Sequence, residues 1–207
     1  MSQRPLSAFL PLALRAWCRP VMLAGLLGAS LPAWADKVVA GVRFDGEQML
    51  AGQALQLNGA GLRVKMIVKV YAVGLYAPQH ASMPQDMLAM PGPKSLRIVL
   101  LRDVTVAQLN EALVNGMRAN ASEAELAGLD ARLSAFEAAI TRGGDAQKGN
   151  LIQIDYLPES GTRLSMGQRV LTQPDIPGED FYRALLRIWL GDKPSDSGLK
   201  RDLLGGA

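Results

Sequence analysis

Three basic side chains lie close together in this sequence, at Arg63, Lys65 and Lys69, and they are its clearest candidates for chemistry. Arg63 follows the segment Asn58-Gly59-Ala60-Gly61, whose composition indicates a turn or a tight backbone site. It also stands at the entrance of the strongest strand pattern in the chain. Two interpretations are open. Either a buried strand positions this cation for function, or the three residues form a solvated basic edge.

The sequence offers few residues for metal binding, cysteine chemistry or catalysis by paired carboxylates. His80 is the only histidine, so a zinc site of the usual kind cannot be built, and we expect His80 at the surface. Cys18 is the only cysteine and lies in an N-terminal segment that we expect to be removed. The acidic residues Glu123, Glu125, Asp130 and Glu137 are spaced like the solvated face of a helix rather than a catalytic pair. We therefore expect no metal and no cofactor, and the sequence pattern identifies no catalytic residue.

Residues 1–35 have the features of a secretory signal peptide. Arg4, Arg15 and Arg19 make a positive region, and an apolar stretch from Val21 to Leu31 follows, which is short for a membrane span. Ala33-Trp34-Ala35 matches a cleavage site, which predicts that the mature chain begins at Asp36. The alternative is an N-terminal anchor that is not cleaved. We expect a periplasmic or secreted protein with one domain over residues 36–207.

Removal of this segment changes the charge of the chain. The whole sequence has 22 basic and 19 acidic residues, and three of the arginines lie in residues 1–35, which leaves 19 of each sign. A neutral mature chain offers no overall electrostatic case for binding nucleic acid. No later apolar run is long and uncharged enough to predict a transmembrane segment.

The strongest strand pattern runs from Val64 to Tyr76. Its even positions are almost all apolar, whereas its odd positions also carry Lys65 and Lys69. Because side chains alternate across a strand, we expect one buried face and one partly polar face. Gly74 is expected at a bulge or at a close backbone approach.

Shorter patterns predict the rest of the sheet and its helices. Further strands are expected at 38–44, 53–57, 95–101, 150–156 and 162–171. Residues 78–93 form a loop rich in methionine, which either packs on the domain or covers an apolar pocket. Helices are expected after a cap at Asp103 or Thr105, from the capping box Ser122/Glu125 to Gly143-Gly144, over 178–190, and after Ser195 or Asp196. This order predicts an α+β fold with a mostly antiparallel sheet backed by helices.

Two patches resemble one known family. GAGLR at 59–63, followed by KVYAVGLY at 69–76, is similar to the first strands of chalcone isomerases and their non-catalytic relatives. The segment WLGDKP at 189–194, with Leu199-Lys200 and Leu203-Leu204-Gly205, resembles the end of the bacterial chalcone isomerase-like branch. The resemblance implies a large sheet backed by helices, with a ligand cleft between the layers.

The resemblance also implies what the cleft can do. Plant chalcone isomerases use an arginine, a threonine, a tyrosine and an asparagine without a cofactor, and only the arginine is matched, by Arg63. The threonine position falls on Tyr71, the tyrosine region reads Val104-Thr105-Val106, and the asparagine position falls on Leu113. So depleted a set of hydrogen-bonding groups should not stabilise that transition state. We therefore expect no plant-type isomerase activity.

The non-catalytic relatives include plant fatty-acid-binding proteins, in which an arginine and a tyrosine hold the carboxylate at the end of an apolar pocket. Arg63 and Tyr71 match this pair, which implies a ligand-binding role for both. On one straight strand they would lie roughly 26 Å apart, at about 3.3 Å per residue. They can share a site only if the chain bends between Val64 and Val68.

Three functions remain open at this point. The leading hypothesis is an exported protein that binds a fatty acid or a similar amphipathic acid between sheet and helices. The alternatives are an intramolecular lyase that acts on an unknown substrate, and an accessory protein that works through its surface.

Overall fold

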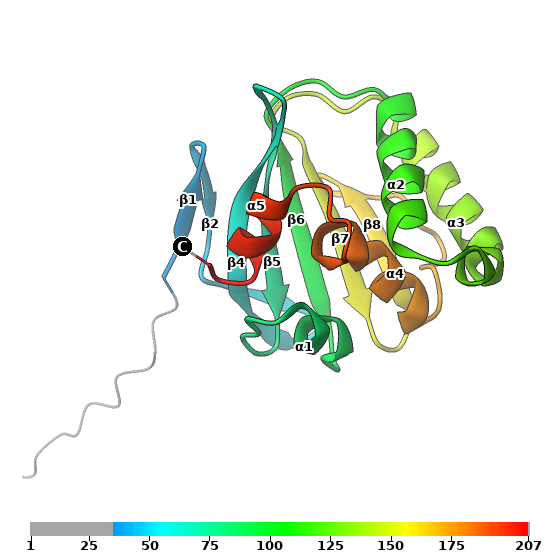
Figure 1. The fold of residues 1–207 in the computed structure, drawn as a ribbon, viewed down its shortest axis with the longest axis horizontal. Helices are drawn as coiled ribbons and strands as arrows, with labels where there is room; N and C mark the ends of the chain where they lie inside the picture. Colours follow the sequence, from blue (N-terminus) through cyan, green and yellow to red (C-terminus); the bar gives the residue numbers. More distant parts are fainter. Residues whose placement is uncertain (1–34, 207) are drawn as a thin grey trace, which may run out of the picture. The chain divides into compact units, whose positions relative to one another are not determined.

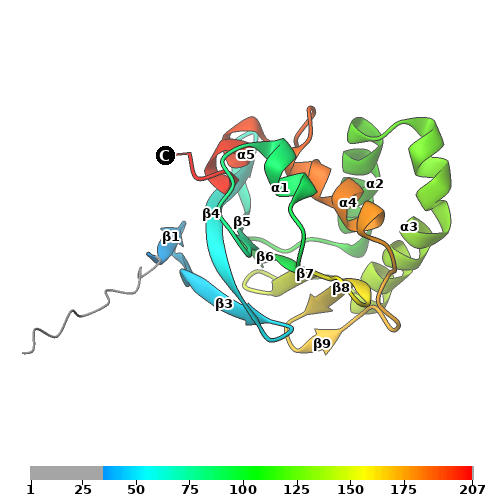
Figure 2. The ribbon, with the colours of Figure 1, turned by 90° about the horizontal axis from the view of Figure 1, so that it is seen from below.

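A curled antiparallel sheet with helices on its concave face organises the chain (Figures 1 and 2). The computed structural model describes residues 35–206, and the signal-peptide prediction for residues 1–35 falls almost wholly outside them. The strands are β1 (Lys37–Val39), β2 (Val42–Phe44), β3 (Glu47–Leu50), β4 (Gln53–Lys65), β5 (Val68–Ala77), β6 (Lys94–Leu100), β7 (Leu151–Leu157), β8 (Gly161–Met166) and β9 (Arg169–Val170). The helices are α1 (Pro84–Ala89), α2 (Val106–Asn120), α3 (Glu123–Gly143), α4 (Glu179–Leu190) and α5 (Ser197–Leu203).

The main sheet has seven strands in the order β3-β4-β5-β6-β7-β8-β9, and every neighbouring pair is antiparallel. Figure 2 shows this sheet curving around the helices, with α2 and α3 at one side and α4 and α5 across its open face. β1 and β2 form a separate hairpin. The α+β class and the antiparallel sheet backed by helices are therefore as the sequence predicts.

The chain reverses direction inside the strand predicted from Val64 to Tyr76, and that prediction is wrong in its first part. β4 ends at Lys65, Met66 and Ile67 form a two-residue turn, and β5 begins at Val68. Met66 has φ 58, a conformation that L-residues rarely adopt. The turn composition that usually marks a hairpin is missing here, which explains why the sequence pattern hides it.

Both faces of β5 are buried from Ala72 onward, so the partly polar face expected for this strand is wrong beyond Lys69. Val73 and Leu75 face the main core beneath the helices, whereas Ala72 and Tyr76 face a smaller cluster that contains Phe44. A Cβ at Gly74 would lie 2.6 Å from the Phe44 ring, which confirms the close approach expected there. The β1–β2 segment thus covers the outer face of the sheet.

The glycine-rich segment is a tight backbone site and not a turn. It lies inside β4, where Asn58 is the extra residue of a register shift and its side chain bonds the backbone of Ala81 and Leu203. A Cβ at Gly59 would lie 2.2 Å from the carbonyl oxygen of Asp202. Glycine here lets α5 pack directly on the sheet backbone.

The long helices follow the caps and apolar stripes of the sequence. Thr105 and Ser122 cap α2 and α3 by accepting from backbone N–H groups, and Asp196 caps α5 in the same way. Leu113 and Met117 of α2 and Phe136 of α3 are buried in the main core. α4 buries most of its length, and Gly191 ends it.

Several shorter elements differ from the prediction. The strand expected at 38–44 is the β1–β2 hairpin, and the strand expected at 162–171 is divided into β8 and β9. The loop at 78–93 contains α1, whose Met87 is fully buried. Of the residues the structure describes, none forms a helix long and apolar enough to cross a membrane.

Candidate functional site

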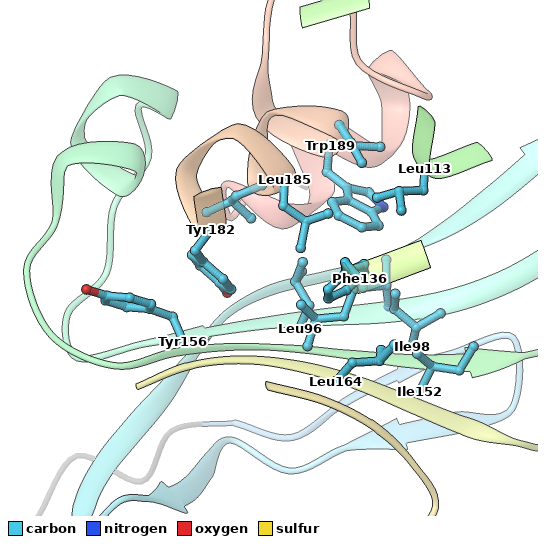
Figure 3. Packing of buried hydrophobic residues seen from close by; sticks show 14 of the residues in the cluster. Leu96, Ile98, Leu113, Phe136, Ile152, Tyr156, Leu164, Tyr182, Leu185 and Trp189 are labelled. Carbon is cyan, nitrogen blue, oxygen red and sulfur yellow. The ribbon is translucent and has the colours of Figure 1, made fainter. Parts of the chain in front are cut away.

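A cavity of about 540 Å³ lies between the sheet and helices α2, α3 and α4. Buried apolar side chains from both layers make its inner wall, and Figure 3 shows Leu113, Phe136 and Trp189 facing Ile98 and Ile152 across the core. Other buried lining residues are Ile140, Ile154, Leu164 and Leu185. Pockets of about 300–1,000 Å³ with mostly apolar walls are typical of small-molecule sites.

One end of the cavity is polar and open to solvent. Exposed side chains from β4, α2 and the segment after α4 line this mouth, namely Lys65, Gln108, Glu111, Asn115 and Lys193. The mouth therefore has an excess of cations over anions, and the interior is apolar. Such a gradient suits a ligand with a negatively charged head and a hydrocarbon body.

The structure brings Arg63 and Tyr71 together at this cavity. Because the chain turns at Met66-Ile67, Arg63 on β4 and Tyr71 on β5 are direct cross-strand partners. Directly opposite residues on antiparallel strands point to the same face of a sheet, with Cβ atoms about 4.5–5.5 Å apart. Both residues line the cavity. The wide separation expected for a straight strand is therefore wrong, and the two side chains share one site.

Tyr71 is held in place by Trp189. The indole Nε1–H of Trp189 donates to the Tyr71 hydroxyl oxygen at 2.9 Å. An indole N–H can only donate, so Tyr71 accepts this bond and keeps its own hydrogen for another acceptor. Burial raises the pKa of Tyr71 above its usual value, although Trp189, Arg63 and Ser195 partly offset that effect. The phenol therefore remains a neutral donor at physiological pH.

Arg63 is held partly by Asp196, the residue that caps α5. Its Nη1 donates to the Val64 carbonyl oxygen at 2.7 Å and lies 3.3 Å from Oδ2 of Asp196. Burial raises the pKa of Asp196, but the backbone N–H of Leu199 and the Arg63 guanidinium together hold that pKa below its usual value. Asp196 is thus an anion at neutral pH and would compete with any acidic ligand for Arg63.

Arg102 is a further cation at the site that the sequence reasoning missed. It follows β6, whose Leu100 pairs with Tyr71, and its side chain lines the cavity. Its Nε is buried and has no hydrogen-bond partner among residues 35–206. Trp189 and Asp196 were also missed as site residues, since their patterns indicate only a buried helix position and a helix cap. The C-terminal family patch was the one signal that could have drawn attention to Trp189.

Other residues singled out in the sequence lie away from the cavity or serve the fold. The Thr105 hydroxyl is occupied as the cap of α2, whereas Leu113 lines the cavity with an apolar side chain. The methionines of the loop at 78–93 do not line it, so that loop packs on the domain rather than covering the pocket. His80 is exposed, as expected. Glu125 pairs with Arg187 across helices, so it does not belong to a purely solvated face.

The part of the chain that the structure describes contains no cluster of three or more histidine, cysteine, aspartate or glutamate side chains suited to a metal ion. Cations, a phenol and apolar walls are the main features of the site. Those groups can bind and orient an acid, because a guanidinium and a phenol are both hydrogen-bond donors.

The comparisons with known proteins agree with this architecture. A family model described as chalcone isomerase-like matches residues 36–205. The crystal structure of a fatty-acid binding protein from Arabidopsis thaliana has a similar fold, with a TM-score of 0.65, 15% sequence identity, and coverage of 82% of this chain and 96% of that chain. No curated protein matches the sequence significantly. Because the family match spans nearly the whole described chain, the protein belongs to the chalcone isomerase-like family.

Proposed function

We propose that this protein binds a fatty acid, or a similar amphipathic acid, with the carboxylate at Arg63 and Tyr71 and the hydrocarbon chain in the 540 Å³ cavity. The observation that carries the proposal is the cross-strand pairing of these two donors at the rim of an apolar cavity. The similar fold of the plant fatty-acid binding protein supports it.

The two donors have distinct tasks in this arrangement. The Arg63 guanidinium supplies the charge, and its side chain remains 21% exposed, so an incoming carboxylate can reach it at the mouth. A hydrogen bond to a charged group contributes about 1.5–3 kcal/mol. Tyr71 donates its hydroxyl hydrogen, which the Trp189 bond leaves available. Both groups recognise the head of the ligand and not its tail.

The tail is bound by the hydrophobic effect. The inner wall is built from side chains such as Phe136, Leu164 and Leu185, each less than 4% exposed. Burial of one methylene contributes about 0.8 kcal/mol, which is roughly fourfold in affinity. Affinity should therefore rise with chain length until the cavity is filled and then stop rising.

Export completes the proposal. A signal peptide over residues 1–35, cleaved before Asp36, would deliver a neutral chain without a thiol to the periplasm or the exterior. N-terminal sequencing of exported material tests this step. A mature chain that begins at Met1 would contradict it.

Trp189 provides a direct test of binding. It is the only tryptophan after residue 35, and it contacts Tyr71 at the cavity. We expect its fluorescence to change in a saturable way when saturated fatty acids of increasing length are added to the mature protein. The dissociation constant should fall by about fourfold per added methylene and then level off.

Native mass spectrometry of protein isolated from its own periplasm gives an independent check, because a tightly held lipid survives purification. An adduct with the mass of a fatty acid is the expected result. If no fatty acid of any length changes Trp189 fluorescence and no adduct is retained, the cavity does not bind this class of ligand.

A further inference from the structure

The tip of the β4–β5 hairpin exposes large apolar side chains. Met66 and Ile67 are each 93% exposed, and Val68, the next residue, is 47% exposed. These three consecutive residues form the hairpin tip. The other large exposed apolar residues among 35–206, at Val38, Met49, Met83 and Val170, are separated from one another in the sequence. A contiguous exposed apolar group of this kind marks a contact with another surface more often than a single exposed residue does.

Folding alone does not explain the residues at the hairpin tip. The two neighbouring hairpins turn at Ala40-Gly41 and Ala51-Gly52, where small residues occupy the positive-φ positions. The turn between β4 and β5 places Met66 at φ 58, where glycine would be favoured. Met66 therefore combines an unfavourable backbone conformation with an exposed apolar side chain, and neither feature stabilises the domain.

The hairpin tip is flanked by cations on both faces of the sheet. Lys65 lines the cavity and so lies on the concave face, whereas Lys69 pairs with Val64 and lies on the opposite face. Neither lysine forms an ion pair within the described part of the chain. The stretch from Arg63 to Tyr71 contains three basic residues and no acidic one. Asp196, an anion close to this stretch, is engaged by Arg63.

The hairpin tip adjoins the mouth of the cavity. Lys65 belongs to the mouth and is directly followed by Met66, and Arg63 and Tyr71 stand at the base of the same turn. A surface that contacts the tip would thus lie next to the opening through which an amphipathic ligand enters. Apolar side chains flanked by lysines fit the interface of a lipid bilayer. There the apolar side chains can insert among the acyl chains, while the lysines contact anionic headgroups.

We propose that the hairpin tip Met66-Ile67-Val68 docks the protein on an anionic lipid membrane, with Lys65 and Lys69 at the headgroups and the cavity mouth beside the bilayer. This goes beyond acid binding in solution and does not require it. The three apolar side chains of the tip and the two lysines act together, so binding to vesicles depends on both the apolar tip and the surface charge. Higher salt weakens the charged part of that contact.

A vesicle co-flotation experiment tests the proposal with the mature protein. Wild type should float with vesicles of phosphatidylcholine and phosphatidylglycerol and much less with phosphatidylcholine alone. The double variant Met66→Gly, Ile67→Ser keeps a sequence suited to a turn with positive φ at its first position, so the fold is retained. Its partition onto anionic vesicles should fall by about tenfold or more. Lys69→Gln should lower it by a few-fold.

Met49→Ser is the matched control, because Met49 is 66% exposed and lies by the turn at the other end of β4. It should float like wild type. Fatty-acid titration of the tip double variant by Trp189 fluorescence should match wild type, since Met66 and Ile67 do not line the cavity. Equal flotation of wild type and the double variant would overturn the proposal. A wild-type protein that does not float with vesicles would also overturn it. This includes the case in which light scattering shows that the tip mediates a dimer instead.

Discussion

Trp189 and Tyr71, which are 118 residues apart in the sequence, are joined by a hydrogen bond of 2.9 Å from the indole nitrogen to the phenol oxygen. The bond connects α4 to β5 at the rim of the cavity. It fixes the direction in which Tyr71 can donate, because the indole occupies the acceptor side of the hydroxyl. The head of the site is therefore organised by contacts between the two sequence patches that carry the family resemblance.

A double-mutant cycle should detect this bond. Trp189→Phe and Tyr71→Phe each remove one partner, and the double variant removes both. We expect a coupling of about 1 kcal/mol in the free energy of unfolding, measured by urea denaturation followed by circular dichroism. Additive single effects would show that the bond contributes nothing to stability.

Removal of the negative charge of Asp196 should strengthen acid binding. Asp196→Asn keeps a good helix cap for α5 but no longer competes for Arg63. Because the pair is partly exposed, the gain in affinity for a fatty acid should be a few-fold at most. Trp189 fluorescence titration measures it.

Asp180→Asn is the control for this gain. Asp180 pairs with Arg132 and neither residue lines the cavity. The affinity of the Asp180→Asn variant for a fatty acid should match that of wild type. Unchanged or weaker binding in Asp196→Asn would mean that Asp196 does not compete with the ligand.

A single methyl group at Gly59 should weaken the docking of α5. Its Cβ would lie 2.2 Å from the Asp202 carbonyl oxygen and 2.7 Å from that of Leu203. Gly59→Ala should therefore lower the free energy of unfolding by about 1–3 kcal/mol or more. Gly128→Ala, in α3 with no atom within 4 Å of the added Cβ, should instead raise it by roughly 1 kcal/mol. Chemical denaturation measures the free energy of unfolding of both variants. A Gly59→Ala protein as stable as wild type would contradict the close packing of α5 on β4.

The sheet class and the long helices could be predicted because they depend on periodicity and caps. The stripe through Leu113 and Met117 and the cap at Ser122 are local signals, and both occur as expected. The reversal at Met66-Ile67 could not be predicted, because neither residue favours a turn and the alternation of apolar residues continues through it. Tertiary pairing across Arg63 and Tyr71 overrides the local pattern there.

The candidate site was predictable only in part, for a related reason. Arg63 and Tyr71 could be named from the family resemblance, but their convergence required the hairpin. Trp189 and Asp196 come from elements that are distant in sequence, so their contacts with Tyr71 and Arg63 leave no local signature. Arg102 lies just after a strand and carries no pattern of its own.

The protein should not accelerate the cyclisation of chalcones. Leu113 lines the cavity at the position where the family's asparagine is expected, and Thr105 is used as a helix cap. Without these hydrogen bonds, the transition state for chalcone cyclisation lacks the main source of electrostatic stabilisation. An absorbance assay should return the spontaneous rate. Clear acceleration that is lost in Arg63→Ala would favour an intramolecular lyase instead.

The comparison of a fatty acid with its alcohol, in wild type, Arg63→Ala and Tyr71→Phe, tests the central claim most directly. Trp189 fluorescence titration should show that Arg63→Ala weakens binding of the acid by about one to two decades, since the lost bond to a charged group contributes about 1.5–3 kcal/mol. Tyr71→Phe should weaken it by less, and the alcohol should bind all three proteins with similar affinity. Equal affinities of wild type and Arg63→Ala for the acid would contradict a carboxylate site at Arg63 and Tyr71.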